Sequence, residues 1–122
     1  MKETTMLKYG WMGILLFSVL MGCGGMRPEE KVDRLVAASH QGDLETVNTL
    51  IKNGVDVNGQ TKIKGYFALQ AAANQNQVAI VERLIEAGAD IHLVDASFWS
   101  ALAEACYEGH INVVYSLVNH GV

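Results

Sequence analysis

Residues 69–91, LQAAANQNQVAIVERLIEAGADI, contain two short helical patterns separated by a turn. The first pattern presents small and apolar groups on one face, at Leu69, Ala72 and Ala73. Asn76 is predicted to end it, because asparagine tolerates the left-handed conformation that a helix end requires. The second pattern has an apolar stripe at Val78, Val81, Leu84 and Ile85. Gly88 is predicted to end this second helix, so the stretch indicates a helix, a turn and a second helix.

The same pattern occurs three times along the chain, in residues 37–57, 71–91 and 104–122. The turn residues correspond at spacings of 34 and 33, at Gly42, Asn76 and Gly109. One helix pair cannot bury its own apolar face. A period near 33 residues therefore predicts a stack of units rather than a closed globule. Such a stack favours binding over catalysis as the function.

The repeated unit resembles the ankyrin repeat, and the resemblance covers roughly residues 30–122. The family's closing motif is similar to Gly54-Val55-Asp56-Val57-Asn58 and to Gly88-Ala89-Asp90-Ile91-His92, and its turn is similar to Gly109-His110. The resemblance implies an all-α ankyrin-repeat solenoid of about three helix-turn-helix repeats joined by hairpin-like loops. We expect the repeats at about 29–58, 59–92 and 93–122.

The opening of each repeat departs from the family's pattern. Phe67 stands where the family has a capping threonine, and Gln70 and Ala103 stand where it has a histidine. Phe98 occupies a position where glycine would relieve a positive φ. These departures concern the loops, whereas the helix and turn signals recur in register.

The N-terminus has the pattern of a secretory signal. Lys2 and Lys8 precede an apolar run at residues 9–21. The sequence Leu20-Met21-Gly22-Cys23 resembles the bacterial lipobox, which implies cleavage of residues 1–22 and acylation of Cys23. We then expect a short tether at 23–28 before the repeat domain at 29–122. An uncleaved membrane anchor is the alternative.

A localisation follows from this resemblance. Gly24 after the cysteine is similar to lipoproteins sorted to the outer membrane. We therefore expect a lipid-anchored protein of the bacterial cell envelope that faces the periplasm. Several acyl chains attach a protein stably where a single chain does not.

Composition argues against several other classes of function. The formal net charge is −4, and Lys62 and Lys64 are the only local basic pair, so nucleic acid is not expected as a partner. We find no Ser-His-Asp set, no phosphate-binding glycine loop and no histidine or cysteine at metal-ligand spacing. We therefore expect no enzyme activity, no cofactor and no metal. Cys106 aligns with Ser39 and Ala73 and is predicted to be a buried structural thiol.

The family resemblance also implies where a protein partner would bind, namely at the loop tips and at the ends of the first helices. Carried onto this chain, these positions include Lys62, Lys64, Tyr66, Asn74, Gln75, Ser97, Trp99, Tyr107 and Glu108. The aromatic members are the expected anchors, because aromatic side chains bury much area at low entropic cost. The alternative is that Tyr66 and Trp99 only stack on each other between adjacent loops.

The function expected from these observations is a membrane-anchored protein-interaction module of the cell envelope. The alternatives are a periplasmic inhibitor or immunity protein that neutralises an exported toxin, and the N-terminal part of a longer multidomain protein. We also expect self-association through the C-terminal repeat. Its last helix has an apolar set at Val113, Val114, Leu117 and Val118, and some of these side chains should not be covered by other residues of the chain.

Overall fold

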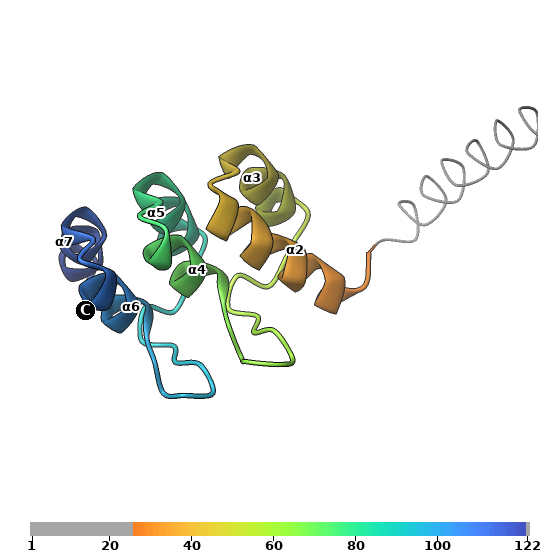
Figure 1. Ribbon diagram of the computed structural model, residues 1–122. Coiled ribbons are helices and arrows are strands. Elements are labelled where there is room, and N and C mark those ends of the chain that lie inside the picture. Colours follow the sequence, from red (N-terminus) through yellow and green to blue (C-terminus); the bar gives the residue numbers. More distant parts are fainter. Residues whose placement is uncertain (1–25, 122) are drawn as a thin grey trace, which may run out of the picture.

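The computed structural model describes residues 26–121 and shows a single elongated stack of helix pairs (Figure 1). The predicted signal peptide at 1–22 and the predicted acylation site Cys23 lie outside the described residues. Within the described part, six helices follow one another, α2 (Pro28–Gln41), α3 (Leu44–Lys52), α4 (Ala68–Asn74), α5 (Val78–Glu86), α6 (Ala101–Glu108) and α7 (Ile111–Asn119). The all-α solenoid predicted from the repeat is therefore confirmed. Among these residues no helix combines the length and apolar character that crossing a bilayer requires.

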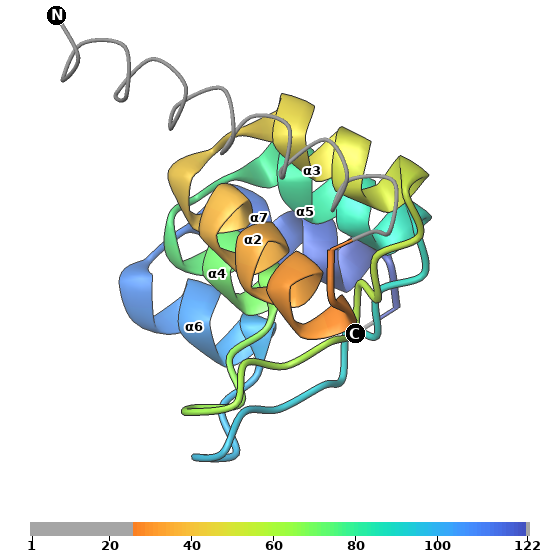
Figure 2. The ribbon, with the colours of Figure 1, turned by 90° about the vertical axis from the view of Figure 1, so that its right-hand side faces the viewer.

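The helices form two layers, with α2, α4 and α6 in one row and α3, α5 and α7 in the other (Figures 1 and 2). Within each row every helix packs against the corresponding helix of the next repeat, and within each repeat the two helices pack against each other. The core lies between the layers, and its fully buried side chains include Leu35, Val47, Leu69, Val81, Leu84, Val113 and Leu117.

The turns inside the repeats have the geometry that their residue types predicted. Gly42 and Gly109 have φ angles of 81° and 74°, and Asn76 adopts the same left-handed conformation at 57°. After each turn a backbone N–H returns to a carbonyl of the preceding helix, as Gln77 N–H does to the Ala72 oxygen at 2.9 Å. This bond satisfies a carbonyl that the helix end leaves unpaired.

The three repeats begin their first helices in different ways. α2 starts with Pro28, followed by Glu29 and Glu30 in the first turn, as expected for a helix N-terminus. α6 is capped by Ser100, whose side chain accepts a hydrogen bond from the Ala103 N–H. Phe67 precedes α4 without a capping bond, but its ring is 1% exposed. At the N-cap position the second repeat therefore has a buried apolar side chain in place of a polar capping residue.

The stripe predicted for the second helix of the middle repeat is incomplete. Val81 and Leu84 are fully buried, whereas Val78 and Ile85 are only partly covered. Ile80, which the stripe leaves out, is 2% exposed. α5 packs against α3, α4 and α7, so more of its surface is covered than a single stripe spans.

The prediction that Cys106 is buried is wrong, because its thiol is exposed. Its equivalents Ser39 and Ala73 are fully buried. They lie in α2 and α4, each of which packs against the first helix of the following repeat, whereas α6 packs against α4 and α7 within the described residues. A residue at this position is therefore covered by the first helix of the next repeat and not by the helices of its own repeat.

Candidate partner-binding face

Two hairpin-like loops extend from the same edge of the stack and lie side by side (Figures 1 and 2). Loop 1 comprises residues 53–67 between α3 and α4, and loop 2 comprises residues 87–100 between α5 and α6. Each is closed at its base by an isolated antiparallel bridge, Gln60 with Phe67 in loop 1 and Val94 with Ser100 in loop 2. The loops and the first helices together form the face on which the predicted binding residues lie.

Hydrogen bonds between the two loops hold them at a fixed spacing. The Gln60 side-chain amide donates to the Gly65 carbonyl at 2.8 Å and to the Val94 carbonyl at 2.7 Å, so one group joins both loops. The Ala96 N–H donates to the Lys64 carbonyl at 3.1 Å. The face is therefore preorganised, which lowers the entropic cost of binding.

Asp95 organises the tip of loop 2. Its carboxylate accepts hydrogen bonds from the Ser97 N–H at 2.8 Å, from the Trp99 N–H at 2.9 Å and from the Gln70 side chain at 2.9 Å. Burial acts to raise the pKa of Asp95, but these hydrogen bonds outweigh it and hold the pKa below its usual value. Gln70, which replaces the family's histidine, thus fixes the loop from inside the core.

Two aromatic residues on this face form a pair, which differs from the Tyr66–Trp99 stack considered as the alternative to binding. Trp99 and Tyr107 meet edge to face, with ring centroids 6.1 Å apart and an interplanar angle of 77°. Tyr107 remains 77% exposed and Trp99 38% exposed. The alternative of a Tyr66–Trp99 stack is therefore replaced by a contact between loop 2 and the end of α6, and the pair keeps a large open surface.

Tyr66 lies deeper, in a cavity of about 770 Å³ between α2 and loop 1. The cavity has apolar lining from Val36, Ile63 and Tyr66 and polar lining from Asp33, His40, Thr61, Lys62 and Lys64. Burial, followed by the negative charges of Glu104, Asp95 and Glu108, raises the pKa of Tyr66 to about 12.

The other predicted binding residues differ in whether their side chains are already engaged in hydrogen bonds or ion pairs within the chain. The Lys62 ammonium lies 2.7 Å from Glu29, which attaches loop 1 to α2. The Asn74 side chain donates to Glu104 and thereby joins α4 to α6, and Gln75 donates to Asn74 at 2.6 Å. Asn74 is therefore engaged within the stack.

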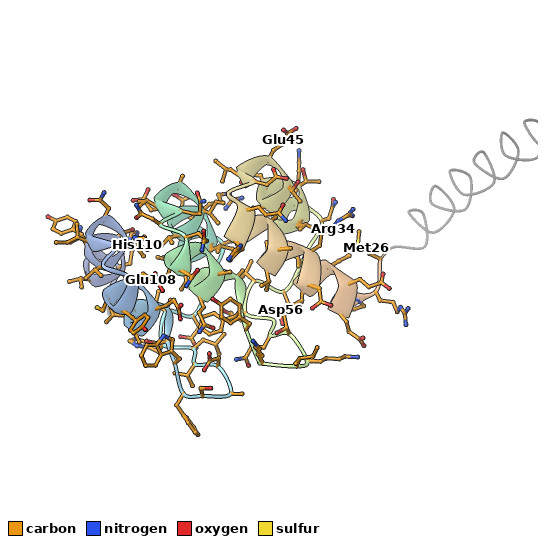
Figure 3. All side chains as sticks on the ribbon, viewed as in Figure 1. Met26, Arg34, Glu45, Asp56, Glu108 and His110 are labelled. Carbon is orange, nitrogen blue, oxygen red and sulfur yellow. The ribbon has the colours of Figure 1, made fainter. Side chains whose placement is uncertain are left out.

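The remaining positions point into solvent. Glu108 lies exposed at the end of α6, next to His110 (Figure 3). Ser97 and Lys64 are exposed at the two loop tips. These side chains are available to a partner.

Two exposed apolar residues were missed as candidate contacts. Ile63 at the tip of loop 1 is 91% exposed, and Phe98 at the tip of loop 2 is 86% exposed. Phe98 has the positive φ of 61° that its position predicted. A large apolar side chain in the middle of a short loop was the available signal for both.

The groups on this face differ from those of a metal site. Within residues 26–121 no group of three or more histidine, cysteine or acidic residues could hold a metal ion. The face instead combines exposed aromatic rings, a half-buried tyrosine and amide groups on a fixed framework, which suits recognition of another macromolecule.

Comparison with known proteins identifies similar chains. A family model described as ankyrin repeats, three copies, matches residues 35–122. Ankyrin repeat domain-containing protein 40 of Mus musculus is 35% identical over 65 residues, 53% of this chain and 18% of that protein. Protein phosphatase 1 regulatory subunit 27 of Homo sapiens is 32% identical over 81 residues, 66% of this chain and 53% of that protein. Putative ankyrin repeat protein YahD of Escherichia coli K12 is 34% identical over 82 residues, 67% of this chain and 40% of that protein. The chain spans about half the length of these relatives or less.

Proposed function

Because this chain belongs to the ankyrin repeat family, whose repeats are protein–protein interaction modules, we propose that it is a membrane-anchored module that binds a protein in the bacterial cell envelope. The binding site is the face formed by the two loops and the ends of α4 and α6 (Ala68–Asn74 and Ala101–Glu108). One of the relatives is named as a regulatory subunit of protein phosphatase 1, which supports a role in binding.

The observation that carries the binding site is the Trp99–Tyr107 pair. Its rings contact each other edge to face, yet Tyr107 keeps 77% of its surface exposed. An aromatic ring that is fixed on one side and open on the other offers apolar area without a large entropic cost, which is typical of binding hot spots. The cavity at Tyr66 lies between α2 and loop 1.

The test is capture of a partner from a detergent-solubilised envelope, compared among variants. Trp99→Ala and Tyr107→Ala should each weaken capture at least tenfold, which is about 1.4 kcal/mol, while the helical signal stays intact. Leu44→Ala is the control, because Leu44 is 37% exposed but lies on α3 (Leu44–Lys52), away from this face and from α7. Equal capture by all three variants would move the binding site away from the aromatic pair. A captured toxin would identify the periplasmic inhibitor role rather than a scaffold.

The anchoring part of the proposal is supported by the Leu20-Met21-Gly22-Cys23 motif. Cys23→Ser should lose incorporation of a labelled fatty acid and should leave the membrane or accumulate as the uncleaved precursor. Cys106→Ser is the matched control and should be labelled normally, because it removes the only other cysteine of the chain. Normal labelling of Cys23→Ser would refute acylation at that residue.

A second copy of the chain is the occupant that we propose for the exposed side of α7. Ile111 is 76% exposed and Val118 is 52% exposed on this helix, and Val114 is partly covered, while Val113 and Leu117 are fully buried. Apolar groups that gather on one surface favour association. Sedimentation velocity should show a dimer that Val118→Lys dissociates. A purely monomeric wild-type chain would refute self-association.

A further inference from the structure

The tips of the two loops carry the most exposed large apolar side chains of the described residues. Ile63 in loop 1 is 91% exposed and Phe98 in loop 2 is 86% exposed. Both loops extend from the same edge of the stack, beyond the helices (Figures 1 and 2). Two protruding apolar groups on one edge form a surface that the fold itself leaves unburied.

The backbone conformation at Phe98 indicates that this residue does not stabilise the fold. Phe98 adopts a φ of 61°, and the corresponding residue of loop 1 is Gly65 at 65°. Glycine takes this conformation without steric cost, whereas a bulky side chain does not. Because the ring is also almost fully exposed, its burial cannot offset the backbone strain. Strain of this kind at an exposed residue indicates a role outside the folded chain.

The spacing of the two tips is fixed by the bonds between the loops. The Ala96 N–H donates to the Lys64 carbonyl, and the Gln60 amide bridges Gly65 and Val94. Ile63 and Phe98 thus lie on loops that are bonded to each other and can contact a single surface at the same time. Contacts made from a rigid support lose little entropy on binding.

The charge around the tips differs from that of the whole chain. The net charge is −4, but the tip of loop 1 carries Lys62 and Lys64. Lys62 is shared with Glu29, whereas the Lys64 ammonium has no carboxylate within 4.0 Å among the described residues. In loop 2 the Asp95 carboxylate is occupied by two backbone N–H groups and by Gln70. The tips therefore present apolar groups and a free ammonium, while Glu29 and Asp95 are each engaged by other groups of the chain.

We propose that Ile63 and Phe98 insert into the headgroup region of the anionic membrane that holds the chain, with Lys64 at the lipid phosphates. This inference rests on the anchoring proposed above. A fluid lipid surface accepts single protruding side chains flanked by lysine, whereas a folded partner would need two matching pockets. An N-terminal anchor keeps the tips at a high effective concentration near the bilayer, so a weak contact is sufficient. The contact would fix the orientation of the domain on the membrane.

The experiment uses the fluorescence of Trp99, which neighbours Phe98. Trp11 lies in the predicted signal peptide that cleavage removes, and Trp11→Phe removes its emission from any uncleaved chain, so Trp99 is the only emitter in both forms. The full chain is reconstituted in vesicles of phosphatidylethanolamine and phosphatidylglycerol, with and without lipid that is spin-labelled near the headgroup. We expect the spin label to quench Trp99. Vesicles of phosphatidylcholine alone should give weaker quenching, because they carry no net charge for Lys64.

Three variants locate the contact. Phe98→Gly suits the local φ and should fold, and it should lose most of the quenching. Ile63→Ser changes the tip of the other loop and should also lose quenching. Leu44→Ser changes an apolar side chain that is 37% exposed on α3, away from the tips, and it should be quenched like the wild type. Circular dichroism confirms that each variant is folded.

Two outcomes separate this inference from the anchor itself. If the chain floats with the vesicles but Trp99 is not quenched, or if quenching persists in both tip variants, the insertion is refuted and the anchor stands. If the chain does not float, the anchor is refuted. In that case quenching of Trp99 on addition of vesicles still supports insertion of the tips, and its absence refutes it.

Discussion

Gly65 and Phe98 occupy corresponding positions in the two loops, so the cost of a side chain at a positive φ can be tested by removing it at one position and adding it at the other. Both have φ angles near 60°, at 65° and 61°. A residue with a side chain loses about 1–2 kcal/mol in the left-handed region relative to glycine. Glycine in turn makes the unfolded chain more flexible, which costs about 0.4–1 kcal/mol. The balance predicts that Phe98→Gly raises the free energy of unfolding by about 0.5–1 kcal/mol, because an 86% exposed ring contributes little packing.

The reverse exchange, Gly65→Ala, should destabilise the domain. A Cβ at Gly65 would lie 3.2 Å from the Ala96 backbone nitrogen, which donates the bond that joins the loops. This close contact adds to the left-handed penalty, so we expect a loss of at least about 1 kcal/mol.

Urea denaturation followed by circular dichroism measures both effects. With a slope of about 2 kcal/mol/M, a change of 1 kcal/mol moves the midpoint by about 0.5 M. Ile63→Ala is the control and should shift it little, since Ile63 is 91% exposed. A lower midpoint for Phe98→Gly would show that the ring stabilises the fold and would refute the argument from strain.

Three further predictions follow from burial and charge. Leu84→Ala should lower the free energy of unfolding by about 2–5 kcal/mol in a denaturant titration, because Leu84 is fully buried between repeats. A decrease no larger than that caused by a substitution at an exposed residue would contradict the packing. Tyr66 should titrate near pH 12 when it is followed by ultraviolet absorbance. Its neutral form contributes fully to the stability of the fold below pH 10, and this contribution should be lost as the pH rises from 10 to about 12. Tyr66→Phe should lack this loss, and a wild-type titration near 10 would refute the burial. Cys106 in the Cys23→Ser variant should react with a thiol reagent without denaturant, and protection of the thiol would contradict its exposure.

The fold could be predicted from sequence because the informative residues are local. Gly42, Asn76 and Gly109 end helices through their own backbone preferences, and the structure confirms all three left-handed turns. The recurrence of the turns at a fixed period then implied the stack. Phe98 likewise has the positive φ expected from its place in the repeat.

The features that sequence could not predict depend on neighbours from other repeats. Cys106 was expected to be buried like Ala73, but burial at this position comes from the following repeat. Ile80 is buried because α5 is covered by three helices, which a single periodic stripe does not reveal. The edge contact between Trp99 and Tyr107 joins a loop to a helix end, and its geometry depends on the Asp95 bonds that shape the loop.

The bond between the Lys64 carbonyl and the Ala96 N–H also limits how this surface can change in evolution. An insertion or deletion near either tip would shift one loop past the other and remove this bond together with the Gln60 bridge. Substitution of Ile63 or Phe98 leaves both intact, since neither side chain takes part in them. We therefore expect homologous chains to keep the length of both loops and to vary in the identity of the tip residues, so that a change of ligand requires only point substitutions.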